Sequence, residues 1–342
     1  MSAAHHYCTY FDHRYLPRAL ALYRSLCTHD GDFLLWALCF DDHAYQRLKA
    51  MELPNLRPIA LEEFLHGDVE LAAVRGNRSL VEFYFTCSPS LPGFVFKNAP
   101  EVQQVTYLDS DLYFFQSPAP VFREIGSASI AIIPHRFPKS LRHLEKTGVF
   151  NVGWLTFCRD EEALTCLSRW RRQCLDWCFD RVEGSRYADQ GYLTQWPEQF
   201  PNLIILKHKG ANLAPWNITN YNLRVQDEWV WVDEDPLIFY HFQSLTRIVP
   251  QVYKINFRRY RSRPSQLVKR YIYLPYLIEL ERVYSGENID QKDERLRWVG
   301  DRSYLFSFQR GMSLLAMLKY NLGILRDRLN GDFLFIKDFW ND

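Results

Sequence analysis

The sequence predicts an α/β fold built on a parallel sheet with helices on both faces, followed by a basic C-terminal region. Apolar segments of strand length alternate with amphipathic segments of helix length, which is typical of such a sheet. A chain of 342 residues with 47% hydrophobic residues can bury one large core. Because the charge turns from negative to positive near residue 247, we expect a domain at 1–250 and a separate region at 251–342.

Strands and helices are expected to alternate in the first part of the chain. The strands are expected at 5–12, 33–40, 56–61 and 102–108. The helices between them are expected at 15–29, 43–51 and 75–91.

The second part adds more strands, one long helix and a hairpin. Strands are expected at 129–137, 151–157 and 202–208. An amphipathic helix is expected at 161–182, and a hairpin at 228–242 is expected to turn at Asp233–Pro236. The region after residue 250 is basic and aromatic, and mainly helical segments are expected at 252–284 and 304–329.

Several classes of protein are not expected from the composition. The eight cysteines are scattered without a C-x-x-C pair, which argues against a disulfide scaffold and against a zinc cage. The N-terminal residues do not resemble a signal peptide, and no segment is long and apolar enough for a membrane span. A cytoplasmic protein is therefore expected.

The stretch "TYLDSDLYFF" at 106–115 places two carboxylates, Asp109 and Asp111, next to apolar segments. In an extended strand, residues i and i+2 point to the same side. Two carboxylates at the carboxyl end of a parallel strand can hold a divalent cation that also accepts phosphate oxygens. A second Asp-x-Asp, Asp233 and Asp235, has the same spacing, but the following proline indicates a solvated turn.

Four further motifs follow the Asp pair in order. They are "FNVGWLTF" at 150–157, "YADQGYL" at 187–193, "ANLAPWN" at 211–217 and "FYHFQSLTR" at 239–247. Residues 6–250 thereby resemble the nucleotide-sugar glycosyltransferases of the A-type fold, and are similar to family 8, which includes glycogenin and bacterial lipopolysaccharide galactosyltransferases. This resemblance implies a Rossmann-like fold with a mixed, mainly parallel sheet.

The resemblance implies a metal site and a diphosphate site. Asp109 and Asp111 would meet the metal and the ribose, and His241 would be the third protein ligand. Two carboxylates and an imidazole suit Mn²⁺, with Mg²⁺ as the alternative. Arg247 stands where the family has a lysine and would bind the diphosphate. His208, which also precedes a Pro-Trp pair, stays open as the alternative to His241.

The resemblance also implies residues for the sugar and the acceptor. Asp189 would accept hydrogen bonds from the hydroxyls of the donor sugar, and Gln190 would lie near its anomeric carbon. Asn151 would line the acceptor pocket, although a turn residue that caps backbone groups is the alternative. Trp216 and Asn217, together with Asn212, would shape the sugar subsite, unless they form a corner of the core.

The nucleotide side rests on the fold resemblance, because loops at the end of a sheet bind such ligands. The residues implied for the loop around the base are Thr9, Tyr10, Phe11, Asp12 and Tyr15. Arg78 could reach the diphosphate, and a surface salt bridge is its alternative role.

The resemblance as a whole implies a metal-dependent hexosyltransferase of polysaccharide biosynthesis. It would move a sugar from a nucleoside diphosphate donor, expected to be a UDP-sugar, to a saccharide or a lipid-linked glycan with retention of configuration. A catalytically silent relative that binds the same ligands is the alternative. A nucleotidyltransferase is not favoured, because the loop after the first strand has no glycine.

The basic segment at 253–273 interleaves cations with tyrosines and phenylalanines. Such a surface suits the headgroups of an anionic membrane, so peripheral contact with the inner face of the membrane is one interpretation. A solvated face of helices packed on the catalytic domain is the other. Nucleic acid is not expected as a partner, because no known binding module accompanies the charges.

Overall fold

A mixed sheet of seven strands forms the centre of the protein. The computed structural model describes residues 5–285 and 323–336. The strand order is β3-β2-β1-β4-β7-β6-β8. The strands are β1 (His5–Phe11), β2 (Phe33–Cys39), β3 (Leu56–Ala60), β4 (Gln104–Leu108), β6 (Ile130–Pro134), β7 (Phe150–Cys158) and β8 (Leu203–Ile205). Only β7 runs antiparallel to its neighbours, so the expected mixed, mainly parallel sheet is confirmed.

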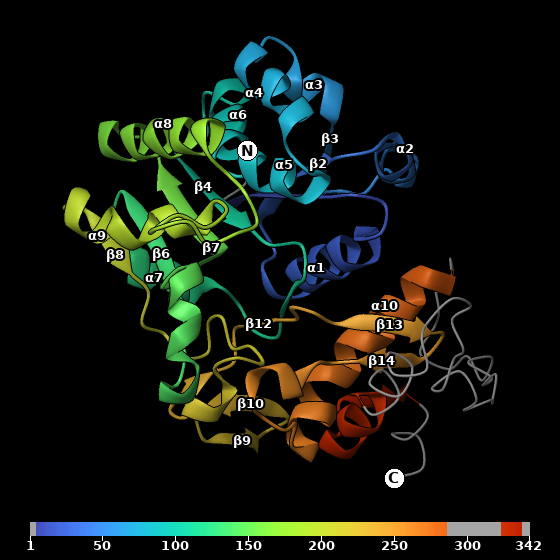
Figure 1. Cartoon of the computed structure of the whole chain (residues 1–342). Coiled ribbons are helices and arrows are strands. Elements are labelled where there is room, and N and C mark those ends of the chain that lie inside the picture. The colour runs from blue at the N-terminus through green and yellow to red at the C-terminus, as the bar shows by residue number, and fades with distance from the viewer. Residues whose placement is uncertain (1–4, 286–322, 337–342) are drawn as a thin grey trace, which may run out of the picture.

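Helices cover both faces of this sheet, as Figure 1 shows. They are α1 (Leu16–His29), α2 (Asp42–Met51), α3 (Leu61–Leu65), α4 (Val69–Val74), α5 (Leu80–Cys87), α6 (Ser90–Asn98), α7 (Ala119–Ile125), α8 (Glu161–Asp176) and α9 (Trp196–Gln199). A further helix, α10 (Leu274–Ser285), packs against α1 rather than on the sheet. Successive side chains of a strand point to opposite faces. Cys8 accordingly packs in the core beneath α3–α6 and α8, whereas Tyr7 packs beneath α1 and α7.

Two expected helices have different bounds in the structure. The segment at 75–91 is divided between a 3-10 turn, Arg75–Asn77, and the helices α5 and α6. The side chains of Ser79 and Glu82 form a capping box that starts α5 anew. The helix expected at 161–182 ends at Asp176, because Trp177 takes an extended conformation.

The hairpin expected at 228–242 is confirmed at its turn but not along its second arm. β9 (Leu223–Gln226), β10 (Trp229–Val232) and β11 (Asp235–Pro236) form a small antiparallel sheet. The chain then leaves it and forms β12 (Phe239–His241), which pairs with β5 (Leu112–Phe114) directly after the Asp pair. This pairing carries residues from late in the chain to the end of β4.

The described part of the C-terminal region packs against the rest of the protein. It contains β14 (Val252–Lys254), helical turns at Phe257–Tyr260 and Val268–Tyr273, α10, a helix at 323–330 and β15 (Phe333–Phe335). β14 pairs with β15 and with β13 (Thr246–Val249). A shared core joins α10 to Ala21 of α1, and a domain boundary near residue 250 stays a prediction.

Part of the basic C-terminal charge is neutralised internally. Lys254 and Arg258 both pair with Asp327, whose side chain is buried. Within residues 5–285 and 323–336, no helix combines the length and the apolar character needed to cross a membrane. Most of the helix expected at 304–329 lies outside the described residues.

Candidate active site

Asp109 and Asp111 lie directly after β4, at the edge of the sheet where the parallel strand β1 also ends. The expectation that they are alternate residues of an extended strand is wrong. The chain turns there, and the Leu112 amide donates to the Asp109 carbonyl oxygen at 3.2 Å. The Phe242 amide donates to the carbonyl oxygen of Asp111 at 3.0 Å. The turn, rather than the strand pleat, holds the two carboxylates beside β12.

The His241 side chain completes a cluster with both carboxylates. Its Nε2 atom lies 3.1 Å from Asp111 Oδ1 and 3.6 Å from Asp109 Oδ2. One ligand atom from each of the three residues can be chosen so that all lie within 4.8 Å of one another. No other group of this kind occurs among residues 5–285 and 323–336. Carboxylate oxygens suit both Mn²⁺ and Mg²⁺, and the imidazole nitrogen favours Mn²⁺ over Mg²⁺.

Gly153 makes room for the imidazole ring. A Cβ atom at this position would lie 3.0 Å from His241 Nδ1 and 2.5 Å from Asn151 Oδ1. The Gly153 carbonyl oxygen also accepts a hydrogen bond from the Asp109 amide at 3.2 Å. The glycine of the "FNVG" motif is therefore required by the close approach of His241 to β7.

The electrostatics of the cluster differ between the two acids. Burial raises the pKa of Asp109 to about 6, while the charge of His241 opposes the shift. Burial also acts on Asp111, but the charge of His241 and a hydrogen bond from it outweigh burial and lower the pKa. For His241, burial lowers the pKa, and the interaction with Asp111 more than offsets this and raises it. A cation would have to displace the imidazolium proton.

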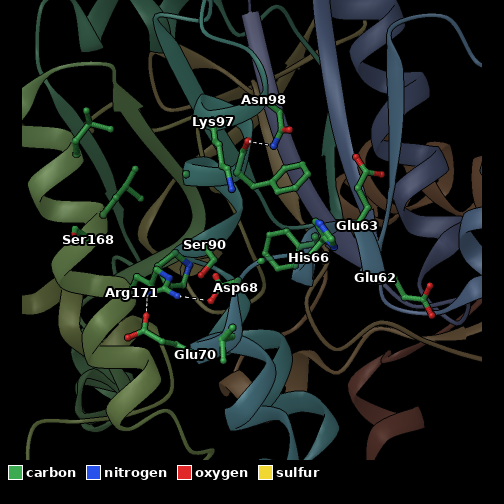
Figure 2. Close-up of a pocket in the computed structure, with 18 residues that line it drawn as sticks. Glu62, Glu63, His66, Asp68, Glu70, Ser90, Lys97, Asn98, Ser168 and Arg171 are labelled. Atoms are coloured by element: carbon green, nitrogen blue, oxygen red, sulfur yellow. Dashed lines mark hydrogen bonds and ion pairs between the residues drawn. The ribbon is translucent and has the colours of Figure 1, made fainter.

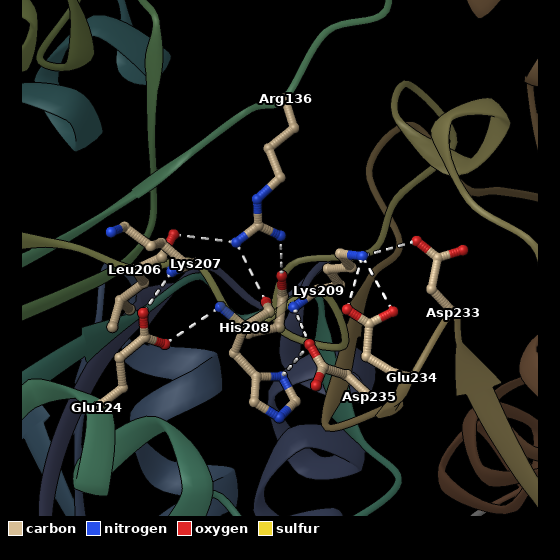
Figure 3. Close-up of polar contacts among 10 residues, drawn as sticks. Glu124, Arg136, Leu206, Lys207, His208, Lys209, Asp233, Glu234 and Asp235 are labelled. Carbon is tan, nitrogen blue, oxygen red and sulfur yellow. Dashed lines mark hydrogen bonds and ion pairs between the residues drawn. The ribbon is translucent and has the colours of Figure 1, made fainter.

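The alternative ligand His208 is not a member of this cluster. Figure 3 shows the polar contacts that hold it instead. Its backbone amide donates to Glu124 at 3.1 Å, and its carbonyl oxygen accepts from Arg136 at 3.2 Å. The His208 ring lies 4.0 Å from Asp235, which also accepts a hydrogen bond from the Lys209 amide. His208 and the second Asp-x-Asp thus belong to a network that fixes the loop after β8.

Asp189 interacts electrostatically with Asp109 and with Tyr10. The Asp189 side chain is 4% exposed, and burial raises its pKa to about 7 against a hydrogen bond from Ser88. The Tyr10 hydroxyl lies 3.1 Å from Ser88 Oγ. Burial raises the pKa of Tyr10, and the negative charges of Asp189 and Asp109 raise this pKa further. Tyr107 donates to Asp109 Oδ1 at 3.0 Å. Asp189 is therefore near enough to Asp109 for the two charges to interact.

Gln190 and Asn151 are engaged with the backbone. Gln190 Nε2 donates to the Thr147 carbonyl oxygen at 2.7 Å. Asn151 Oδ1 accepts from the Gly153 amide at 3.0 Å, and its Nδ2 atom lies 3.2 Å from His135 Nε2. His135 is buried, and burial lowers its pKa to about 3.

Trp216 and Asn217 are buried, and the Trp216 ring packs on His241. The Trp216 ring meets the His241 ring edge-on, with centroids 5.1 Å apart, and its Nε1 atom donates to the His135 carbonyl oxygen at 2.8 Å. Asn217 donates to the same oxygen at 3.0 Å and to the Asn212 carbonyl oxygen at 2.9 Å. These hydrogen bonds anchor Trp216 and Asn217 to the backbone, and Trp216 in turn contacts the His241 ring.

The N-terminal loop lies at the same sheet edge as the cluster. Thr9 and Phe11 are buried in β1, whereas Asp12 follows it and accepts hydrogen bonds from Arg14 Nε at 2.8 Å and from the Tyr84 hydroxyl at 3.3 Å. The Tyr84 ring stacks on Phe40 at 3.9 Å. No motif in the sequence indicated that Tyr84 and Phe40 would lie here.

The two arginines expected at the diphosphate are engaged elsewhere. The Arg78 guanidinium lies over the Phe179 ring, with its Cζ atom 4.1 Å from the centroid, and donates to the Leu175 carbonyl oxygen at 3.1 Å. Arg247 forms a two-point ion pair with Glu281, at 2.7 and 2.8 Å.

A separate cavity of about 980 Å³ lies between α3, α4, α6 and α8 (Figure 2). None of the site residues expected from the sequence lines it. Arg171, which does line it, pairs with Asp68 at 2.7 Å and with Glu70 at 2.8 Å. The cavity and the Asp-Asp-His cluster have no residue in common.

Comparisons with known proteins reveal two relatives in Bacillus subtilis. No protein-family model matches the sequence. The uncharacterized protein YfnD is 32% identical over 280 residues, which are 81% of this chain and 89% of YfnD. The uncharacterized protein YfnF is 33% identical over 250 residues, which are 70% of this chain and 80% of YfnF.

The solved structures of two transferases are more distantly similar. The galactosyltransferase LgtC, in complex with donor and acceptor sugar analogs, has a TM-score of 0.49 at 14% identity, over 84% of this chain and 98% of LgtC. Mouse xyloside xylosyltransferase 1 has a TM-score of 0.44 at 15% identity, over 70% of this chain and 98% of that protein. Similarity at this level does not establish a shared activity.

Proposed function

The chain belongs to the family of the uncharacterized Bacillus subtilis proteins YfnD and YfnF, and we propose that it is a metal-dependent glycosyltransferase that uses a nucleoside diphosphate sugar. The observation that carries the proposal is the convergence of Asp109, Asp111 and His241 within 4.8 Å. These residues come from segments that are far apart in the sequence and meet at the carboxyl end of parallel strands, where nucleotides bind in α/β folds.

The donor set supports a divalent cation in this cluster. His241 and Asp111 are buried, while the Asp109 side chain is 29% exposed, so the cluster has one side open to a ligand. Mn²⁺, or alternatively Mg²⁺, would be held by these three side chains. A divalent cation bound there supplies positive charge next to the departing diphosphate.

Other residues of the chain would orient the donor. Tyr107 fixes one oxygen of Asp109 through its hydroxyl, which leaves the other carboxylate oxygen for the cation or for the ribose. Thr9, Tyr10 and Phe11 form the end of β1, and Asp12 follows it. These four residues are proposed to border the nucleotide, with UDP as the nucleotide that the family resemblance favours.

The sugar side of the proposal rests on Asp189 and Gln190. The buried Asp189 carboxyl lies close enough to Asp109 to respond to its charge. We assign it to the donor sugar, as an acceptor of hydrogen bonds from the sugar hydroxyls, with Gln190 near the anomeric carbon and Asn151 on the acceptor side. Retention of configuration, a hexose as the sugar, and a saccharide or lipid-linked glycan as the acceptor belong to the same proposal.

The test is release of nucleotide from a panel of UDP-sugars by the purified protein, with Mn²⁺ and again after EDTA. The expected result is metal-dependent release of UDP from one or a few donors, and faster release when the acceptor is present. Tight binding of Mn²⁺ and UDP without any release from the panel would instead identify a catalytically silent relative. Failure to bind any nucleoside diphosphate with Mn²⁺ would contradict both.

A further inference from the structure

The arginine of the late motif is part of the scaffold. Arg247 meets Glu281 of α10 through two parallel hydrogen bonds, and the Glu281 side chain is buried. The Tyr253 hydroxyl and the Gln251 amide donate to the same carboxylate, at 2.5 and 3.1 Å. Moving Arg247 to a ligand would leave a buried carboxylate without its cation, which is strongly unfavourable.

Arg18 of α1 reaches the turn that follows His241. Its Nη2 atom donates to the Leu245 carbonyl oxygen at 2.7 Å, and its Cζ atom lies 4.3 Å from the centroid of the Tyr15 ring. The charge of Arg18 is also one of the causes that lower the pKa of Asp111, after those due to His241. Among the described residues, Arg18 has no ion pair with a carboxylate, so most of its five N–H donors are free for a ligand.

Arg259 reaches the same turn from the opposite part of the chain. Its Nη1 atom lies 3.4 Å from Ser244 Oγ, and the backbone of Ser244 is in the left-handed region, with φ of 63°. Arg259 is exposed and also forms no ion pair within the part of the chain that the structure describes. Its charge opposes the rise in pKa of Tyr187, two residues before Asp189.

The turn itself is fixed from the C-terminal side. The Tyr260 hydroxyl donates to Gln243 Oε1 at 2.7 Å, and Asn256 donates to the Ser244 carbonyl oxygen. The Tyr260 ring also lies 6.1 Å from the ring of Trp216, which packs on His241. Residues 256–260 are therefore part of the surroundings of the Asp-Asp-His cluster, although the sequence assigned them to a separate region.

We propose that Arg18 and Arg259 hold the diphosphate of the donor from either side of the turn at Ser244 and Leu245, and that Arg247 is a structural residue. This inference rests on the proposed function. Both guanidinium groups contact consecutive residues of one turn next to the metal cluster, and neither charge is already paired with a carboxylate of the described chain. Guanidinium groups bind phosphate oxygens through paired hydrogen bonds, which suits this task.

The test measures ligand binding by calorimetry for five variants. Each variant is titrated with Mn²⁺ alone and then with a nucleoside diphosphate in the presence of Mn²⁺. The diphosphate used is the one among UDP, GDP and ADP that wild type binds most tightly. The test variants are Arg18→Gln and Arg259→Gln. Arg24→Gln is the matched control on α1, since Arg24 pairs with Glu279, and Arg258→Gln is the matched control next to Arg259. The fifth variant is Arg247→Gln. Circular dichroism and melting temperatures report on folding, and Arg18→Lys replaces Arg18→Gln if that variant is unstable.

We expect Arg18→Gln and Arg259→Gln each to weaken nucleoside diphosphate binding about tenfold or more. Binding of Mn²⁺ alone should stay equal or become tighter, because a repelling charge has been removed. If the two arginines had a purely structural role, the variants would lose affinity for Mn²⁺ and for the nucleoside diphosphate together. Arg247→Gln should lower the melting temperature and change diphosphate affinity by less than about threefold.

The opposite pattern would overturn the inference: wild-type diphosphate affinity in both test variants, or a selective loss in Arg247→Gln. If wild type binds Mn²⁺ but none of the three diphosphates, the proposed function fails first. If wild type binds one of them and the test variants bind it equally well, only the assignment of the two arginines fails.

Discussion

The Nε2 atom of His241 lies 3.1 Å from Oδ1 of Asp111, although the two residues are far apart in the sequence. Their meeting depends on two short strands, because His241 of β12 pairs in register with Leu112 of β5, the residue after Asp111. Phe239 and Tyr240 of the same strand are fully buried. The apolar packing of β12 therefore determines where the imidazole lies.

Replacing Asp111 by asparagine should remove metal binding while the fold is kept. The side chain keeps its size but loses the charge that both the cation and His241 require. We expect the affinity for Mn²⁺ and the rate of UDP release each to fall by about a hundredfold or more. Asp235→Asn is the matched control, because it alters an Asp-x-Asp of the same spacing that lies beside His208. Equal losses in both variants would contradict the assignment of the site.

The two histidines can be separated in the same way. His241→Gln should weaken Mn²⁺ binding by at least about tenfold, because one of three protein ligands is lost. His208→Gln should leave Mn²⁺ affinity unchanged, since the His208 ring faces Asp235 and its backbone is held by Glu124 and Arg136. Titration with Mn²⁺, followed by calorimetry, measures both, and a metal defect confined to His208→Gln would reverse the assignment.

Much of the fold could be predicted because buried strands are continuous apolar segments. The strands expected at 5–12 and 33–40 end within a residue of β1 and β2. The direction of a strand leaves no such pattern, so the antiparallel β7 could not be derived from periodicity. The end of β11 at Pro236 also depends on a segment that is distant in the sequence, because Phe239–His241 pair with β5 instead of continuing the hairpin.

The site was partly predictable for a related reason. Asp109, Asp111 and His241 carry chemistry that recurs in ordered motifs, so a resemblance could identify them. The pairing of Arg247 with Glu281 has no sequence signal, because it depends on how α10 packs against β13 and β14. Likewise, "IIPHRF" gives no indication that His135 lies under Asn151 and Trp216.

Gly153→Ala should disturb the metal site without touching a ligand. The added Cβ would lie within 3.0 Å of His241 Nδ1 and closer still to Asn151 Oδ1, so the ring must shift. We expect a loss of about 1–3 kcal/mol in the free energy of unfolding and weaker Mn²⁺ binding. Urea denaturation and Mn²⁺ titration measure the two effects.

Gly93→Ala provides the control for this variant. Gly93 lies in α6, and a Cβ there would meet no atom within 4 Å. Because alanine favours the helix, this change should be neutral or should stabilise by up to about 1 kcal/mol. If Gly153→Ala behaved like Gly93→Ala, the close approach of His241 to β7 would be disproved.

Asp189 makes the stability of the protein depend on pH. Its pKa is raised from 3.8 to about 7 in the folded protein, mainly by burial. Between these two values the folded state keeps a proton that the unfolded chain releases, so stability falls as the pH rises through this window. Asp189→Asn cannot ionise and should therefore be more stable than wild type. The advantage should grow from pH 5 to pH 7 and then level off, reaching at most about 4 kcal/mol.

Urea denaturation at pH 5, 6, 7 and 8 in the presence of EDTA tests this expectation, because EDTA keeps metal binding out of the comparison. Asp227→Asn is the control, since Asp227 is exposed and its charge is solvated in both states. An advantage of Asp189→Asn that shrinks as the pH rises would have the wrong sign for a buried carboxyl. It would mean that the folded protein stabilises the ionised form of Asp189, which is incompatible with a pKa raised by burial.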